Sequence, residues 1–242
     1  MHIVYAYLRN QFKQSSNGLM QLILIHILTF LLLFLFNTGC YICGYENQIP
    51  WLYGQLTFPS LYPLLLERPW AFITYSFIHK GFVDLFWDIF ILYIFGQKIR
   101  AITRSKHILR LYFLGQIVGA MLFFTLYQFS PPFKGVADSL TGPSAPIYAI
   151  MIAVCVLMPS LKLYCFFFSL PLRYVAITLL VIALVHLPTQ DAGYYLAQLG
   201  GALSGYLYAR LCKNDLDINP SFFSVHGVRR SRTKMSVTVT KK

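Results

Sequence analysis

Hydrophobic residues gather in six long runs that are separated by polar segments. The runs are residues 19–42, 78–96, 107–128, 144–159, 163–187 and 193–212. A helix of about 20 apolar residues crosses the hydrocarbon core of a bilayer. The pattern therefore predicts six membrane-spanning helices, with 144–159 the shortest. It also divides the chain into an N-terminal segment 1–18, a membrane domain 19–212 and a tail 213–242.

Lysine and arginine residues indicate which segments face the cytoplasm. Basic residues lie before the first run, between the second and third runs, near the turn between the fourth and fifth runs, and at the start of the tail. They are Arg9, Lys13, Lys98, Arg100, Arg104, Lys106, Lys162, Arg173, Arg210 and Lys213. The remaining segments carry Glu46, Glu67, Arg68, Lys134, Asp138 and Asp191, which are mostly acidic. Cytoplasmic segments are enriched in basic residues. We therefore expect an all-α membrane protein of six spans with both termini in the cytoplasm.

Composition supports this prediction and excludes a soluble core. The chain of 242 residues is 57% hydrophobic and only 12% charged, whereas soluble domains average about 25% charged residues. The net charge of +12 comes from residues that flank the apolar runs, so we expect membrane lipid and not nucleic acid as the partner of these residues. The basic tail is either held near anionic lipid or disordered. Short loops favour a bacterial plasma membrane.

The cysteine pattern predicts neither a metal site nor a cofactor. Cys40 and Cys43 form a CxxC pair just after the first run, and no second pair follows at zinc spacing. A disulfide between these two residues stays open as an alternative.

A serine at the start of the fourth run is the first candidate for chemistry. Gly142-Pro143-Ser144-Ala145 precedes a run too short to cross a bilayer unless it begins below the outer surface. Irregular backbone at that depth survives only where protein buries it or where it lines a wet cavity. Ser144 is then either a nucleophile inside the membrane or a small residue that lets helices pack.

Two acids and two glycines mark other positions within the spans. Asp84 and Asp88 are four residues apart on one helical face of the second run, and acids at membrane depth usually serve a function. Alternatively, Asp84 lies at the interface beside Lys80 and only Asp88 lies deeper. Gly201 and Gly205 form a GxxxG pair, which predicts close contact with another helix.

The order and spacing of these motifs resemble the rhomboid family of intramembrane serine proteases, over residues 65–211. Four segments carry the resemblance: the approach to the second helix at Pro69–Gly81, its end at Phe95-Gly96, the glycine-any-serine of Gly142–Ser144, and Ala197–Gly205 on the sixth helix. The resemblance implies the six-transmembrane-helix rhomboid fold with cytoplasmic termini, and it assigns Ser144 the position of the nucleophile.

The catalytic positions depart from the family. Where the resemblance implies a general-base histidine, this chain has Gln198, and an amide is not a base near neutral pH. Where it implies two oxyanion donors, the chain has Asp84 and Asp88, which as carboxylates accept hydrogen bonds and repel an oxyanion. Loss of one such donor costs about 10²–10³ in rate. The backbone N–H of Ser144 remains as the third oxyanion position.

The resemblance, together with these departures, predicts a pseudoprotease that binds transmembrane client segments without cleaving them. A client segment would enter past the second and fifth helices. The first alternative is an active serine endopeptidase that uses Ser144 with a surrogate base, His79 or His186. The second is a proton-linked or ion-linked membrane protein that uses the acid pair Asp84 and Asp88. None of these readings requires a cofactor or a metal.

Overall fold

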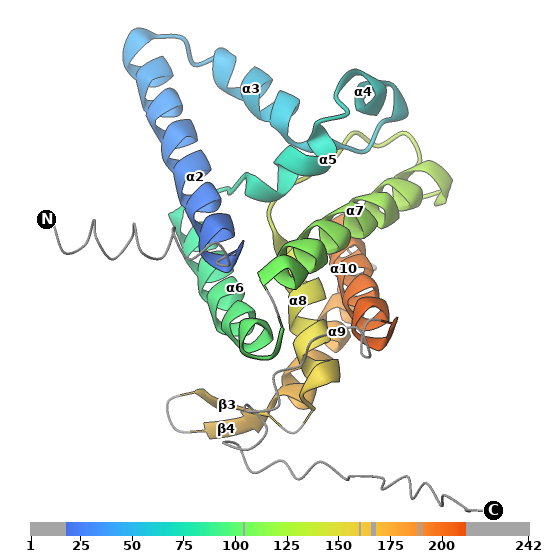
Figure 1. Cartoon of the computed structure of the whole chain (residues 1–242). Coiled ribbons are helices and arrows are strands. Elements are labelled where there is room, and N and C mark those ends of the chain that lie inside the picture. The colour runs from blue at the N-terminus through green and yellow to red at the C-terminus, as the bar shows by residue number, and fades with distance from the viewer. Residues whose placement is uncertain are drawn as a thin grey trace, which may run out of the picture.

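The computed structural model describes residues 18–103, 105–159, 161–165, 168–187, 189 and 191–211, and most of them are helical (Figure 1). Six longer helices correspond to the six apolar runs: α2 (Gly18–Cys43), α6 (Phe82–Ile102), α7 (Ser105–Phe129), α8 (Ser144–Leu157), α9 (Leu172–Val185) and α10 (Ala192–Leu211). The predicted N-terminal segment, apart from Gly18, and the tail 213–242 lie outside the described residues.

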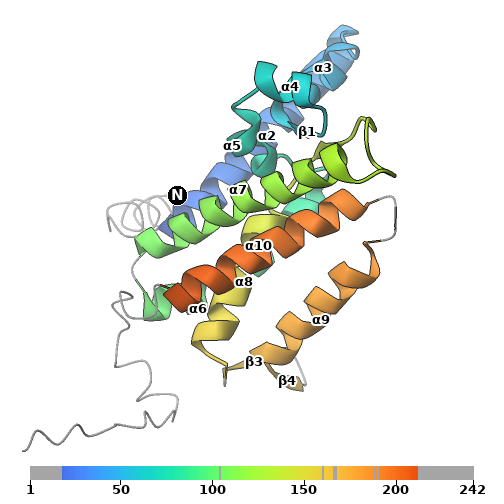
Figure 2. The same cartoon turned by 90° about the vertical axis from the view of Figure 1, so that its right-hand side faces the viewer.

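Helix α8 forms the centre of the core, and α7 and α10 run along it (Figure 2). Eleven of its residues are buried, from Ser144 to Cys155. Small residues make the close packing possible: a Cβ atom on Gly201 would overlap the backbone of Ala145, and one on Gly205 would overlap the backbone of Ala149. The GxxxG pair therefore contacts α8, as the predicted close helix contact requires.

A second packing unit joins α2 to α6 and α7. Gly96 of α6 lies directly against the side chain of Leu19. Further along α2, the buried His26 ring nitrogen Nε2 lies 2.9 Å from the hydroxyl of Tyr112 on α7. That hydroxyl donates a hydrogen bond of 3.2 Å to Ser76. Because these groups are buried, their mutual hydrogen bonds satisfy polar atoms that water does not reach.

The connection between α2 and α6 contains short helices. These are α3 (Gln48–Leu56), α4 (Tyr62–Glu67), α5 (Ala71–Thr74) and the 3₁₀ helix η1 (Tyr75–Phe77). The side chain of Gln116 on α7 donates to the carbonyls of Phe72 and Ile73 at 2.9 and 2.6 Å. The Tyr75 hydroxyl donates back to the Gln116 carbonyl at 2.8 Å, so this connection is anchored on α7.

Two expectations from the sequence are wrong in detail, although the described part of the chain is mostly helical. The run 163–187 is not one helix: β3 (Lys162–Cys165) and β4 (Phe168–Pro171) form an antiparallel hairpin before α9. Aromatic residues favour strands, and Pro171 is compatible with the start of a helix and not with its interior. Helix α6 also continues past Gly96 to Ile102.

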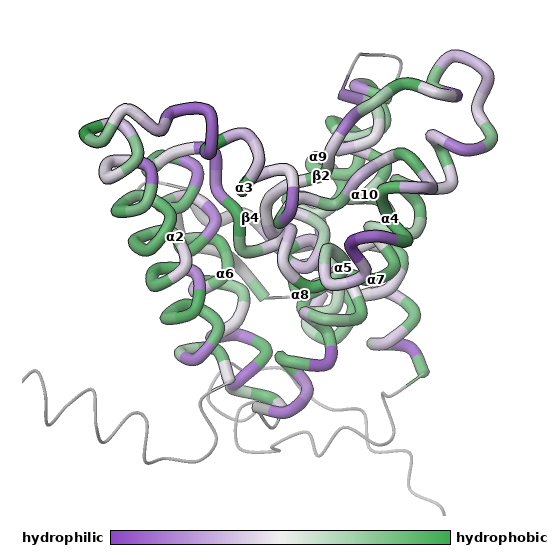
Figure 3. The backbone as a smooth tube through the Cα atoms, turned by 90° about the horizontal axis from the view of Figure 1, so that it is seen from above, coloured by the Kyte–Doolittle hydropathy of each residue, from purple (hydrophilic) through white to green (hydrophobic). Residues whose placement is uncertain are grey.

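Apolar side chains cover the outward faces of several helices, which is typical of a protein surrounded by lipid. Figure 3 shows hydrophobic residues along α2 and α6. Exposed examples include Leu32 on α2, Phe90 on α6 and Val181 on α9. Within the described residues, two helices are long and apolar enough to cross a membrane, Gly18–Cys43 and Lys106–Phe129, and Ser144–Leu157 and Leu172–Val185 are shorter apolar helices.

Candidate active site

Ser144 is the first residue of α8, and the segment before it is held by backbone contacts. Gly142 has a φ of +88°, a conformation that glycine adopts without a Cβ penalty, and its N–H donates to the Tyr75 carbonyl at 3.0 Å. The neighbouring strand β2 (Ser139–Leu140) pairs with β1 (Phe58–Pro59). Ser144 is only 7% exposed. The backbone just before α8 is thus half-buried or buried at residues 140–143, and residues 138–142 also line a cavity.

The first turn of α8 offers two backbone donors at the serine. Helix N-termini leave their first N–H groups without an intrahelical acceptor. Pro146 has no N–H, and the N–H of Ile147 bonds to the Pro143 carbonyl at 2.9 Å. The donors left at this end are therefore those of Ser144 and Ala145. They lie where an anionic oxygen is stabilised by the helix dipole.

Gln198 and Ser144 share a neighbouring tyrosine that sequence reasoning missed. Because Gly201 contacts the backbone of Ala145, the preceding turn of α10 faces Ser144. Tyr194 of α10 lies near both Ser144 and Gln198. Gln198 is 5% exposed, and its Oε1 has no hydrogen-bond partner in the described structure. The available signal was the i, i+4 spacing, which places Tyr194 and Gln198 on one face of α10.

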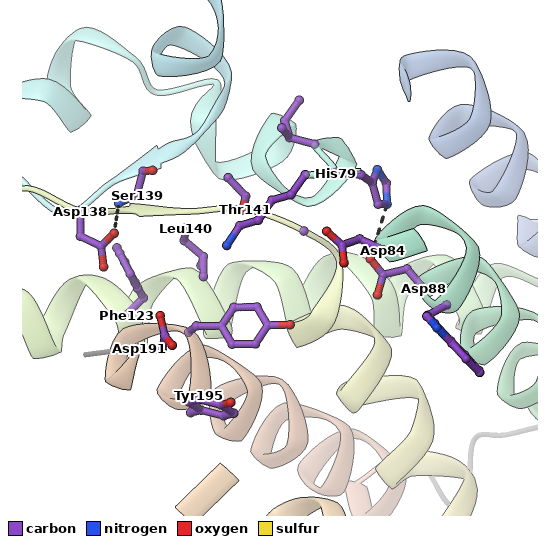
Figure 4. A pocket seen from close by; sticks show the side chains of 15 residues that line it. His79, Asp84, Asp88, Phe123, Asp138, Ser139, Leu140, Thr141, Asp191 and Tyr195 are labelled. Carbon is purple, nitrogen blue, oxygen red and sulfur yellow. Dashed lines mark hydrogen bonds and ion pairs between the residues drawn. The ribbon is translucent and has the colours of Figure 1, made fainter. Parts of the chain in front are cut away.

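The two acids of α6 differ in burial. Asp84 is exposed in the first turn, whereas the side chain of Asp88 is 26% exposed. Asp84 is thus the more exposed of the two acids and Asp88 the more buried. Asp88 Oδ2 lies 3.6 Å from Nε2 of His79, as the dashed line in Figure 4 shows. The His79 ring packs against that of His26, with their centroids 5.1 Å apart.

These acids open onto a cavity of about 320 Å³. Its walls come from the start of α6, the segment 138–142 before α8, and the start of α10, and Tyr194 is part of its lining. Ser144 and Gln198 are not among the lining residues. Tyr194 therefore adjoins both the cavity and the neighbourhood of the serine.

Neither histidine considered as a surrogate base hydrogen-bonds to Ser144 within the described residues. His79 faces Asp88 from the cavity wall. His186, which follows α9, stacks on Tyr195 with ring centroids 4.8 Å apart, and its Nδ1 lies 2.8 Å from the Ile182 carbonyl. The side groups near Ser144 are thus a phenol and an amide, and neither is an effective base at neutral pH.

The CxxC pair forms no disulfide in this structure. Cys40 and Cys43 are both free thiols at the end of α2, and Cys43 is exposed. The alternative of a bond between them is therefore not realised here.

The family model of the rhomboid domain matches residues 66–214, which is more than half of the chain. The chain belongs to the rhomboid family. No curated protein matches it. Membership of this family identifies a membrane protein. The matched residues include the approach to α6, the serine of α8 and the glycines of α10.

Proposed function

We propose that this rhomboid-family protein is a pseudoprotease that binds transmembrane segments of client proteins without cleaving them. The observation that carries the proposal is the surroundings of Ser144: Tyr194 lies near the serine, and Gln198 lies one turn further along the same face of α10. Proton removal from serine requires an adjacent base, and this pair does not supply one.

The acids of α6 add a second obstacle to proteolysis. Asp84 and Asp88 line the cavity where the rhomboid resemblance implies donors to an oxyanion. An ionised carboxylate cannot donate a hydrogen bond, and its charge opposes that of a tetrahedral intermediate. The N–H groups of Ser144 and Ala145 then serve to bind a client carbonyl in its ground state.

A client helix would reach the cavity from the lipid, between α6 and α9. Large apolar side chains are exposed on both helices, including Trp87, Phe90 and Val181. Trp87 also lines the cavity. An apolar client segment can lie against these faces while its polar or unwound portion meets the cavity. We further propose six spans with both termini in the cytoplasm, in a bacterial plasma membrane.

Photo-crosslinking tests client binding. A benzoylphenylalanine at Trp87 should capture membrane proteins, and the same group at Leu32, a lipid-exposed residue of α2, should not. Capture of no membrane protein at either position would contradict the proposal. Proteolysis is tested separately with a fluorophosphonate probe, for which we expect no difference between the wild type and Ser144→Ala.

An active rhomboid endopeptidase is the second candidate, because Ser144 keeps its place at a helix N-terminus with free N–H donors. It predicts fluorophosphonate labelling of the wild type that Ser144→Ala abolishes. That result would also require a base other than the tyrosine and amide described above.

A further inference from the structure

The cavity concentrates negative charge in a chain that is otherwise strongly basic. Four of the eight acidic residues of the protein line it: Asp84, Asp88, Asp138 and Asp191. Figure 4 shows Asp84 and Asp88 on one side and Asp138 and Asp191 on the other. Lys80 is the one basic residue other than His79 in the described lining. Charge at a low-dielectric surface demands a counter-charge.

The molecule itself supplies little of that counter-charge. Asp138 is satisfied, since it accepts hydrogen bonds from the Tyr127 hydroxyl and from the Ser139 N–H. In the described part of the chain, no hydrogen-bond donor reaches the carboxylates of Asp84, Asp88 and Asp191, and Lys80 forms no ion pair with them. The contact of Asp88 with His79 is an ion pair only when that imidazole is protonated.

His79 provides an independent indication of a missing donor. The residue is 4% exposed, lines the cavity, and has no hydrogen-bond partner at Nε2. This nitrogen and Asp88 Oδ2 face each other across 3.6 Å. Buried polar atoms are normally hydrogen-bonded. When the proton of the neutral His79 ring is on Nδ1, both atoms are acceptors, and one donor from a ligand in this gap would satisfy them.

The other walls favour an organic cation over a metal ion. Among the described residues, no group of three or more His, Cys, Asp or Glu side chains is placed to hold a metal. The lining instead includes the aromatic side chains of Trp87, Phe123, Tyr194 and Tyr195. Aromatic faces bind ammonium and guanidinium groups and also pack against their aliphatic stems.

We propose that this cavity binds the lysine or arginine side chain of a client segment, with Asp84, Asp88 and Asp191 as counter-charges and the aromatic walls around its stem. The inference rests on the proposed client binding and names the chemistry that the site selects. A cavity of about 320 Å³ holds one long side chain. A basic residue near the outer end of a client helix would pair here with acids, which offsets the cost of its charge at that depth.

The test uses defined peptides and the full chain in phosphatidylcholine nanodiscs. Three otherwise identical poly-Leu/Ala transmembrane peptides carry lysine, norleucine or glutamate one turn inside the outer interface, and fluorescence energy transfer gives Kd. We expect the lysine peptide to bind about tenfold more tightly than the norleucine peptide, and the glutamate peptide to bind most weakly. n-Butylguanidinium should displace the lysine peptide only.

Matched variants localise the effect. The Asp84→Asn, Asp88→Asn double variant, and separately Asp191→Asn, should lose the lysine preference. The Glu46→Gln, Glu67→Gln variant removes two charges outside the cavity lining and should keep the preference. Equal binding of lysine and norleucine peptides overturns the inference but leaves client binding intact. Absence of binding by all three peptides overturns both.

Discussion

At the scale of single residues, function depends on the atoms that surround one hydroxyl. Ser144 stands at a helix N-terminus with free N–H donors, which is a suitable place for a nucleophile. Tyr194 and Gln198, a phenol and an amide, lie near this position, and the acids of α6 stand where the rhomboid resemblance implies oxyanion donors. The proposed pseudoprotease thus combines the scaffold of a hydrolase with side chains that are poor bases and poor oxyanion donors.

Restoring three side chains tests this explanation. We predict that Gln198→His, Asp84→His and Asp88→Asn together permit fluorophosphonate labelling of Ser144, because a positioned base contributes about 10²–10⁴ in rate and each oxyanion donor about 10²–10³. Mass spectrometry of the labelled protein gives the site and the extent of reaction.

The same triple variant with Ser144→Ala is the control and should show no labelling. Labelling of Gln198→His alone at the level of the triple variant would mean that the acids of α6 do not hinder the serine.

At the scale of elements, the site depends on how closely α8 approaches α10 and α7. Gly201 and Gly205 leave no room for a Cβ against the α8 backbone. Gly119 of α7 is equally close: a Cβ there would lie 2.5 Å from that of Ala145 and 2.8 Å from the carbonyl oxygen of Ala197. These contacts set the depth of Ser144 relative to Gln198.

A methyl group at Gly201 tests this packing. We predict that Gly201→Ala lowers the free energy of unfolding by about 1–3 kcal/mol, since overpacking forces the backbones apart. Circular dichroism during SDS titration in mixed micelles measures the change.

Gly39 on α2 is a matched helical glycine, because a Cβ at this position would meet no atom within 4 Å. Gly39→Ala should leave stability unchanged or raise it by about 0.5–1 kcal/mol, because alanine is favoured over glycine in helices. Equal losses in both variants would show that Gly201 is not a tight helix contact.

At the scale of the whole molecule, opposite charges gather at different segments. The acidic cavity is formed by the start of α6, the segment before α8 and the start of α10. Basic residues instead lie at the other ends of the long helices, at Lys98 and Arg100 on α6 and Arg210 on α10. This arrangement agrees with a cavity that opens to the outer face.

Cysteine accessibility tests the orientation. In a background without the native cysteines, Lys134→Cys should react with a membrane-impermeant maleimide in intact cells. Lys106→Cys should react only after the membrane is permeabilised. Both positions are exposed in the structure, so burial does not account for a difference. The reverse pattern would invert the orientation, and equal reactivity would contradict the six-span topology.

The amino-acid sequence by itself determined the features that depend on local patterns. Hydrophobic runs located the long helices, because crossing a bilayer requires sustained apolar length. The motifs around Ser144 and Gly201 indicated the family, which the rhomboid-domain match confirms, and they predicted the nucleophile position. The residue types at Asp84, Asp88 and Gln198 were enough to predict a loss of proteolytic chemistry, since basicity and hydrogen-bonding capacity belong to the side chain itself.

Only the tertiary structure decided which distant residues meet. The hairpin before α9 was not predictable, because its apolar residues suit a buried strand as well as a helix. Tyr194 reaches Ser144 because small residues bring α10 against α8. Asp138 and Asp191 join Asp84 and Asp88 around one cavity because three helix connections converge there. Such contacts depend on packing between segments far apart in the chain, about which local hydrophobic periodicity carries no information.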